Sequence, residues 1–173
     1  LLIRVDVVPA SLVLAQAANE SGWGTSRFAR EANNLFGIWC FTPGCGLTPS
    51  SRDDGLSHEV ARYESVQDSI SAYIYTINSH PAYRTLRGLR VQTRLYQPEL
   101  EQALAAEFQP DQTTLIGVNC RGSVLAEGLI HYSARGVEYV RDIQQLIRVN
   151  KLHEYTLQAN FPCLTLEPVP GQV

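Results

Sequence analysis

Gln16-Ala17-Ala18-Asn19-Glu20-Ser21-Gly22-Trp23-Gly24-Thr25-Ser26 is the stretch of the sequence that decides the fold. It closes a nearly all-apolar run that starts after Pro9, and such a run predicts a buried helix. Gly22 and Gly24 are expected to end this helix. Glu20 therefore stands at a helix end, where Trp23 and the backbone can fold over its carboxyl. Removal from water disfavours the charged form, which suits a general acid near neutral pH. The alternative is a solvated glutamate, as most glutamates are.

More helices are expected on both sides of a turn-rich segment. Residues 44–57 are rich in Gly, Pro, Ser and Asp, which predicts a small β-hairpin or long loop with a returning strand over 58–63. Helices are expected over 27–32, from Ser65 past Ile77, and over 83–90, 98–108, 123–132 and 137–149. The fold class is therefore mainly α (α+β), with residues 1–160 as one domain and residues 161–173 as an extended arm.

Composition limits the function classes. The chain has 173 residues, of which 45% are hydrophobic and 18% charged, as in an ordinary soluble domain. The formal net charge of -3 gives nucleic-acid binding no electrostatic support. No apolar run approaches the ~20 residues that span a bilayer. Leu1-Leu2-Ile3 lacks the charged start of a signal peptide, and we interpret the chain as a processed or trimmed fragment without its export signal.

The cysteines suggest one local disulfide. Cys40 and Cys45 flank a Pro-Gly turn, which can bring two Cα atoms within disulfide range. Two unpaired thiols are one alternative and a zinc site is a weaker one. An oxidised pair would point to an exported protein. The histidines show no ligand spacing, and we interpret them as structural or surface residues; they are His58, His80, His131 and His153. Neither a metal nor a cofactor is expected.

The opening stretch and a second block, Asn33-Asn34-Leu35-Phe36-Gly37-Ile38, together resemble the signature of the bacterial glucosaminidase family (glycoside hydrolase family 73 type). The following block, Trp39-Cys40-Phe41-Thr42-Pro43-Gly44-Cys45-Gly46-Leu47, is similar to the Bax-like subgroup of Gram-negative bacteria. The resemblance covers roughly residues 5–152. It implies a lysozyme-like helical domain with a small β-hairpin lobe flanking the cleft. It also implies peptidoglycan glycan strands as the partner and a periplasmic or cell-envelope location. We expect a monomer.

The resemblance also implies catalytic roles. Glu20 corresponds to the family's catalytic acid, which protonates the leaving oxygen of a glycosidic bond. Tyr132 falls on the family's tyrosine before the last helix, and Tyr139 is the second tyrosine of that segment. A phenol there could position a water or stabilise positive charge. The alternative for either tyrosine is a core or wall aromatic.

The second carboxylate is the point of departure from the family. Relatives carry it on the hairpin, which here offers Asp53, Asp54 and Glu59. The two aspartates fall at the turn, where aspartate is recruited for backbone reasons. Glu59, on the returning strand, is therefore the predicted second carboxylate, although none of the three aligns cleanly. The substrate's own N-acetyl group could also replace it.

Several side chains are predicted to bind substrate. Aromatic walls suit the apolar faces of sugars, and the candidates are Trp23, Trp39 and Tyr63, whereas Phe36 fits the core better. Asn33 and Asn34 could bind N-acetyl groups or cap a turn. The resulting hypothesis is an endo-β-N-acetylglucosaminidase that cleaves β-1,4 bonds of peptidoglycan. A lytic transglycosylase or muramidase of the same fold is the enzymatic alternative, and a non-hydrolytic peptidoglycan-binding module is the other.

Overall fold

A computed structural model describes residues 4, 6–50, 52, 55–94 and 122–158. The chain divides into two compact units: Val13–His80, and Leu1–Leu12 together with Pro81–Val173. The helix expected over 98–108 and the arm expected over 161–173 lie outside the described residues, as do Asp53, Asp54, Cys120 and Cys163. A single domain over 1–160 stays a prediction. The mainly α fold with a small sheet is confirmed.

The helices of the Val13–His80 unit begin and end at the residues whose chemistry predicts it. Helix α1 (Ala10–Ser21), most of which belongs to this unit, ends where three consecutive residues take positive φ angles: 56° at Gly22, 58° at Trp23 and 75° at Gly24. Positive φ breaks the right-handed helix.

Side-chain caps start the next two helices. Helix α2 (Arg27–Ala32) begins after Ser26, whose hydroxyl accepts a hydrogen bond from the Ala29 amide. Helix α3 (Val66–Ser79) begins after Ser65, which accepts from the Asp68 amide and donates to the Asp68 carboxylate. The starts of both helices were predicted from these caps.

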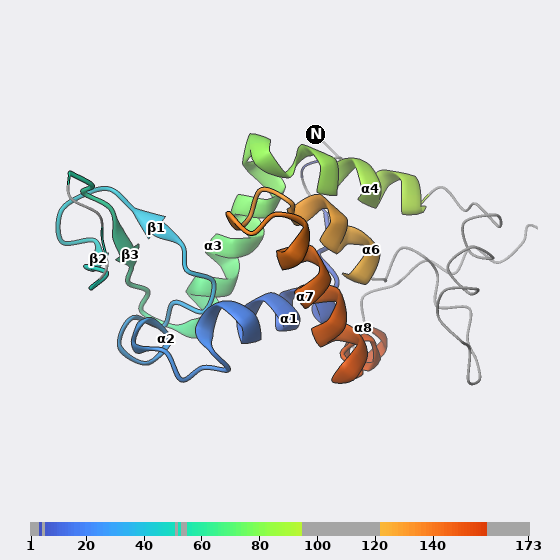
Figure 1. The fold of residues 1–173 in the computed structure, drawn as a ribbon, viewed down its shortest axis with the longest axis horizontal. Helices are drawn as coiled ribbons and strands as arrows, with labels where there is room; N and C mark the ends of the chain where they lie inside the picture. Colours follow the sequence, from blue (N-terminus) through green and yellow to red (C-terminus); the bar gives the residue numbers. More distant parts are fainter. Residues whose placement is uncertain (1–3, 5, 51, 53–54, 95–121, 159–173) are drawn as a thin grey trace, which may run out of the picture. The chain divides into compact units, whose positions relative to one another are not determined.

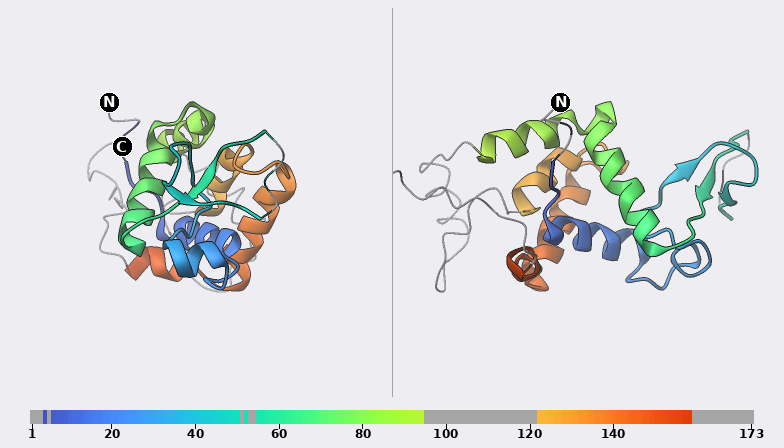
Figure 2. Two further views of the ribbon diagram at one scale, coloured as in Figure 1. Left: turned by 90° about the vertical axis from the view of Figure 1, so that its left-hand side faces the viewer. Right: turned by 180° about the vertical axis from the view of Figure 1, so that it is seen from behind.

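The strands form a three-stranded antiparallel sheet in the order β1-β3-β2 (Figures 1 and 2). The strands are β1 (Trp39–Cys40), β2 (Gly46–Leu47) and β3 (Glu59–Ala61). Trp39 lies opposite Val60 and Cys40 lies opposite Glu59. A Cβ at Gly46 would lie 1.9 Å from the Val60 carbonyl oxygen, so glycine allows β2 to approach β3. The expected hairpin therefore has a central returning strand with a partner on each side.

An aromatic pair lies at the core of this unit. Phe36 stacks on Tyr73 with ring centroids 4.2 Å apart, and both side chains are buried. The Tyr73 hydroxyl donates to the side-chain oxygen of Gln16, which is also fully buried. These contacts join α1, the loop before β1 and α3.

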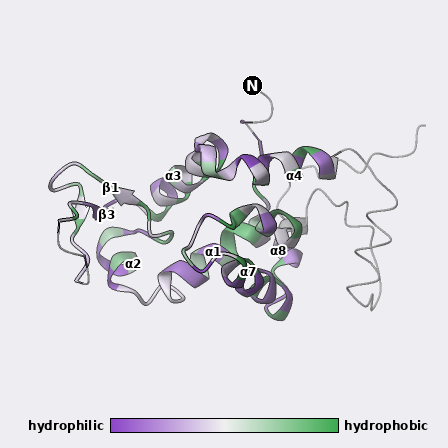
Figure 3. Cartoon of the chain, turned by 45° about the horizontal axis from the view of Figure 1, so that its top comes forward, coloured by the Kyte–Doolittle hydropathy of each residue, from purple (hydrophilic) through white to green (hydrophobic). Residues whose placement is uncertain are grey.

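The second unit is helical. Its described elements after residue 80 are η1 (Pro81–Tyr83), α4 (Arg84–Arg94), α6 (Gly122–Ala126), η3 (Glu127–Leu129), α7 (Val137–Val149) and α8 (His153–Gln158). The bounds of α7 match the sequence prediction. Figure 3 colours the helix by hydropathy, with hydrophilic residues purple and hydrophobic residues green. The helix expected over 123–132 instead consists of α6 and a tighter turn, η3. Helix α8 was not expected. No described helix has both the length and the apolar character needed to cross a membrane.

Close packing explains the tighter turn. A Cβ at Gly128 would lie 2.3 Å from the Leu86 Cα, so η3 packs directly on the backbone of α4. Leu86, Leu129 and Ile143 are fully buried in the same unit. A buried ion pair between Asp6 and Arg90, with Oδ2 and Nε 3.3 Å apart, joins the N-terminal segment to α4.

Candidate active site

Glu20 lies in the last turn of α1 and is half-buried. The Asn19 side-chain amide donates to Glu20 Oε1 at 3.2 Å and orients the carboxyl. Gly37 borders the carboxyl: a Cβ built there would lie 3.8 Å from Glu20 Oε2. Because Gly37 has no side chain, the space beside this oxygen stays open on that side. Gly37 belongs to the second sequence block, but its place beside Glu20 was not predicted.

The turn after Glu20 is fixed by the Ser21 hydroxyl and by a backbone hydrogen bond. The buried Ser21 hydroxyl donates to the Ala17 carbonyl at 2.6 Å and accepts from the Gly24 amide at 2.7 Å. The Trp23 amide donates to the Ala18 carbonyl at 2.8 Å. A positive φ, as at Trp23, is unusual for a bulky residue. Its side chain is 63% exposed, so most of the indole faces solvent instead of covering Glu20.

Asn33 and Asn34 connect the loop before β1 to the chain around β3. The Asn33 amide group donates to the carbonyls of Tyr63 and Glu64 at 3.0 and 3.2 Å. The Asn34 side chain is 1% exposed. It donates to the Ile38 and Ala61 carbonyls and accepts from the Phe36 and Ile38 amides.

These contacts favour the turn-capping alternative over N-acetyl binding. Both amide hydrogens and the carbonyl oxygen of Asn34 are used inside the fold, so this side chain has no exposed group for a ligand. Asn33 is only partly buried, but it takes the left-handed conformation that caps α2, with a φ of 52°.

The Glu59 carboxylate accepts hydrogen bonds from the loop that the Cys40–Cys45 disulfide closes. Cys40 and Cys45 are bonded, with Cα atoms 6.2 Å apart. Glu59 Oε1 accepts from the Gly44 amide at 3.1 Å, and Oε2 accepts from the Gly46 amide at 2.7 Å. Hydrogen bonds from the Gly44 and Gly46 amides, with a smaller effect from Arg52, lower the pKa of Glu59. The sulfurs lie close to this carboxylate, but they are bonded to each other and offer no thiolate for a metal.

The geometry gives Glu59 a structural task in addition to the predicted catalytic one. Both carboxylate oxygens hold backbone amides of the loop, and a lowered pKa weakens a base. Its role as the second carboxylate stays a prediction.

Two predicted wall aromatics lie near the sheet. Trp39 in β1 stacks on His58 with ring centroids 4.0 Å apart and an interplanar angle of 18°. Tyr63 is half-buried, its amide donates to the Ala32 carbonyl, and burial raises the pKa of its phenol. His58 was interpreted from the sequence as a structural or surface residue, and no sequence signal connected it to Trp39.

The predicted tyrosines belong to the other unit. Tyr132 is half-buried and stacks on Tyr139, with centroids 5.5 Å apart and an interplanar angle of 7°. Tyr139 is only 1% exposed, so it supports Tyr132 and offers little surface to a ligand. Tyr83 also contacts Tyr132, with centroids 5.9 Å apart, a contact that the sequence did not predict.

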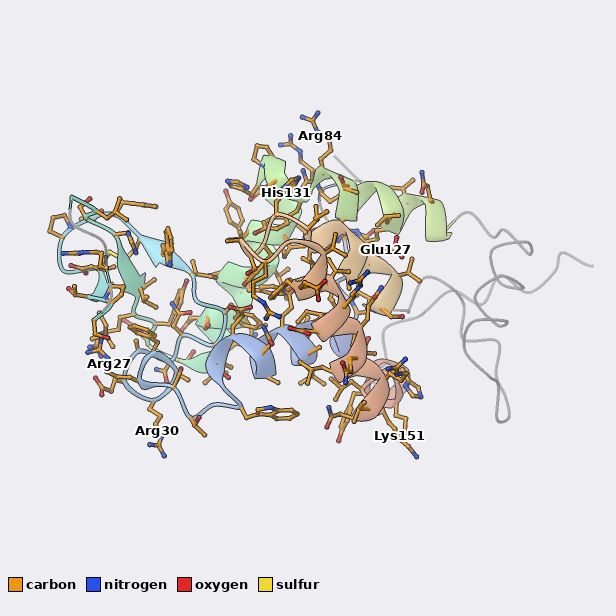
Figure 4. The ribbon with its side chains drawn as sticks, viewed as in Figure 1. Arg27, Arg30, Arg84, Glu127, His131 and Lys151 are labelled. Carbon is orange, nitrogen blue, oxygen red and sulfur yellow. A yellow bond between two sulfur atoms is a disulfide. The ribbon has the colours of Figure 1, made fainter. Side chains whose placement is uncertain are left out.

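The charged side chains labelled in Figure 4 lie mostly at the surface of their own elements. Arg27 and Arg30 belong to α2, and Arg27 donates to the Thr48 carbonyl at 2.7 Å, which joins α2 to the loop after β2. His131 is exposed just before Tyr132.

Comparison with known proteins connects this geometry to one family. The sequence model of the glucosaminidase family, described as mannosyl-glycoprotein endo-beta-N-acetylglucosaminidase, matches residues 2–152. The chain is 44% identical to Protein bax of Escherichia coli (strain K12) over 100 residues, which are 58% of this chain and 35% of that protein. It is 33% identical to peptidoglycan hydrolase FlgJ of the same strain over 88 residues, 44% of this chain and 28% of that protein. FlgJ of Salmonella typhimurium is 32% identical over the same length.

The chain spans about a third or less of the length of these curated relatives. No solved structure gives a significant match. The family match covers every predicted site residue, from Glu20 to Tyr139.

Proposed function

The chain belongs to the glucosaminidase family, and we propose that it is a peptidoglycan hydrolase, an endo-β-N-acetylglucosaminidase with Glu20 as its general acid. One observation carries the proposal: the half-buried Glu20 carboxyl, oriented by Asn19, borders a side-chain-free position at Gly37. Such a carboxyl is partly shielded from water and is open enough on the Gly37 side to meet a glycosidic oxygen. The names of the relatives support peptidoglycan as the substrate.

The proposed reaction uses Glu20 first as a proton donor. Glu20 gives its proton to the bridging oxygen as the bond from that oxygen to the anomeric carbon breaks. Positive charge develops on the sugar ring, and the leaving sugar departs with a hydroxyl. A water then supplies a hydroxyl to the anomeric carbon and releases a proton to a base. Glu59 remains the predicted carboxylate for this second half, and the substrate's N-acetyl group remains the alternative.

Tyr132 is part of the proposal through the family resemblance. Its phenol would position the attacking water or stabilise the developing charge, while Tyr139 and Tyr83 hold its ring. The substrate places the protein in the cell envelope, and we propose the periplasm of a Gram-negative bacterium as its location.

Zymography on purified sacculi tests the acid. We expect lysis by the wild-type protein, and at least a hundredfold less by Glu20→Gln, because the amide cannot donate the proton. Glu64→Gln, an exposed glutamate of the same unit, is the matched control and should lyse normally. A lytic band that survives Glu20→Gln would refute the assignment of Glu20.

Mass spectrometry of the digested sacculi tests the bond. Reducing N-acetylglucosamine ends are expected. Anhydro-muramic ends would instead identify a lytic transglycosylase. If neither the wild-type protein nor Glu20→Gln lyses the sacculi but both sediment with them, the chain is a binding module.

A further inference from the structure

Trp39 presents an aromatic face that the catalytic proposal does not use. The side chain is 55% exposed, although it lies in a strand of the sheet. The His58 imidazole lies nearly parallel to the indole at 4.0 Å and is itself only 8% exposed. Since the imidazole covers one face of the indole, the exposed area must lie on its opposite face and its edges.

The sheet positions the Trp39–His58 pair. Trp39 lies opposite Val60, and His58 precedes Val60 by two positions, so all three side chains are on the same face of the sheet. Val60 is buried. Arg52 donates to the His58 carbonyl at 3.1 Å and anchors the backbone there. The indole is thus braced by the imidazole and the sheet as a platform, which reduces the entropy lost when a ligand binds.

The platform lies close along the chain to the candidate acid. Gly37 borders the Glu20 carboxyl, and Trp39 follows it by two residues. Two residues span at most about 7 Å, so the two Cα atoms are within about that distance. A glycan strand bound beside Glu20 and Gly37 would therefore pass within a short distance of Trp39.

We propose that Trp39, backed by His58, is a stacking subsite for one pyranose ring of the glycan strand, beside the bond that is cut. The inference rests on the proposed function, because that function supplies the polymer. The C–H face of an amino sugar matches the open face of the indole, and the polar edges of the sugar remain in water. His58 is a positioning residue that acts through Trp39 without touching the sugar.

Binding is measured separately from catalysis. Glu20→Gln serves as the parent protein, so bound N-acetylglucosamine oligomers are not cleaved during calorimetry. Trp39→Ala should weaken binding at least tenfold, about 1.4 kcal/mol, and Trp39→Phe should keep most of it. Tyr75→Ala is the matched control, since Tyr75 is 72% exposed on α3 of the same unit, and it should bind like the parent.

Variants at His58 test the positioning role. His58→Ala should weaken binding severalfold, and His58→Phe should restore it by returning a ring beneath the indole. In proteins that retain Glu20, His58→Ala should raise KM and leave kcat nearly unchanged, as expected when ground-state and transition-state binding are lost equally. The chain has two tryptophans, so in a Trp23→Phe background the indole emission reports Trp39 alone.

Three results would overturn the inference. If Trp39→Ala binds the oligomers like its parent while the wild-type protein lyses sacculi, the subsite is refuted and the proposed function stands. If the wild-type protein neither lyses sacculi nor binds oligomers, both fail. If sedimentation shows a self-associated protein that Trp39→Ala makes monomeric, with glycan binding unchanged, a second copy occupies the platform.

Discussion

Gly37 can be tested at the scale of one residue. Gly37→Ala would place a methyl group 3.8 Å from Glu20 Oε2, in the space that the glycosidic oxygen needs, at a backbone φ of +64°. We expect at least a tenfold loss of lytic activity and a decrease of about 1–2 kcal/mol in the free energy of unfolding, because a side chain is strained there. Turbidity assays and urea titrations measure the two effects.

Gly55→Ala separates strain from catalysis. Gly55 has a φ of +88°, and a Cβ there would meet nothing within 4 Å. This variant should lose similar stability and keep its activity. Equal losses of activity in the two variants would mean that Gly37 matters only to the backbone.

The role of Glu59 can be read from stability as a function of pH. The folded-state pKa of Glu59 lies below the ordinary 4.5, so its contribution to stability is fully present above about pH 4.5 and is lost as pH falls through the folded-state pKa. Glu59→Gln should therefore melt below the wild-type protein at neutral pH, and the gap should shrink in acid. Thermal melts from pH 3 to pH 7, with Glu64→Gln as the control, measure this. If the difference in melting temperature between Glu59→Gln and the wild-type protein does not change with pH, the charged carboxylate does not stabilise the loop.

Single residues show both what the sequence can predict and where it stops. Glu20 was predicted at the helix end because the glycines that follow it are a local signal. Gly37 beside Glu20 and His58 beneath Trp39 depend on chain folding between distant positions, which no local pattern records. For Asn34, the sequence left two alternatives open, and four hydrogen bonds inside the fold favour the structural one.

Asn34 also joins elements, and its removal should destabilise the sheet unit. Asn34→Ala would remove this partner from the Ile38 and Ala61 carbonyls and from the Phe36 and Ile38 amides, which are buried or partly buried. We expect a loss of about 2–4 kcal/mol. Asn150→Ala is the control, because Asn150 is exposed and donates only to the Leu146 carbonyl, so its loss should be small. Denaturant titrations compare the two, and equal losses would argue against the internal brace.

At the scale of elements, local chemistry predicted helices better than strands. The caps at Ser26 and Ser65 located α2 and α3, and the predicted bounds of α7 match the structure. The sheet was predicted only as a hairpin, because the strand order depends on Gly46 approaching Val60. The split of 123–132 into α6 and η3 likewise depends on packing against Leu86.

At the scale of the whole molecule, the ion pair between Asp6 and Arg90 connects distant parts of the sequence. Arg90 pairs with the Asp6 carboxylate and also donates to the Asp6 and Val7 carbonyls, across 84 and 83 residues of sequence. Arg90→Met should cost about 3–5 kcal/mol, since it leaves a buried carboxylate without its guanidinium. The double variant Asp6→Asn with Arg90→Met should recover part of that loss in thermal melts. No recovery would mean that Arg90 matters through its carbonyl contacts alone. Sequence reasoning had no means to pair these residues.

The Cys40–Cys45 bond also bears on the order of events during oxidation. Four cysteines can form two pairs in three ways, yet these two sulfurs are only five residues apart in sequence. Short loops close on a submicrosecond timescale and at low entropic cost. The native pair can therefore be sampled before any distant cysteine arrives, and Glu59 then favours the loop once β3 has docked. The short separation therefore lowers the entropic cost of this pairing relative to pairings that must close longer loops.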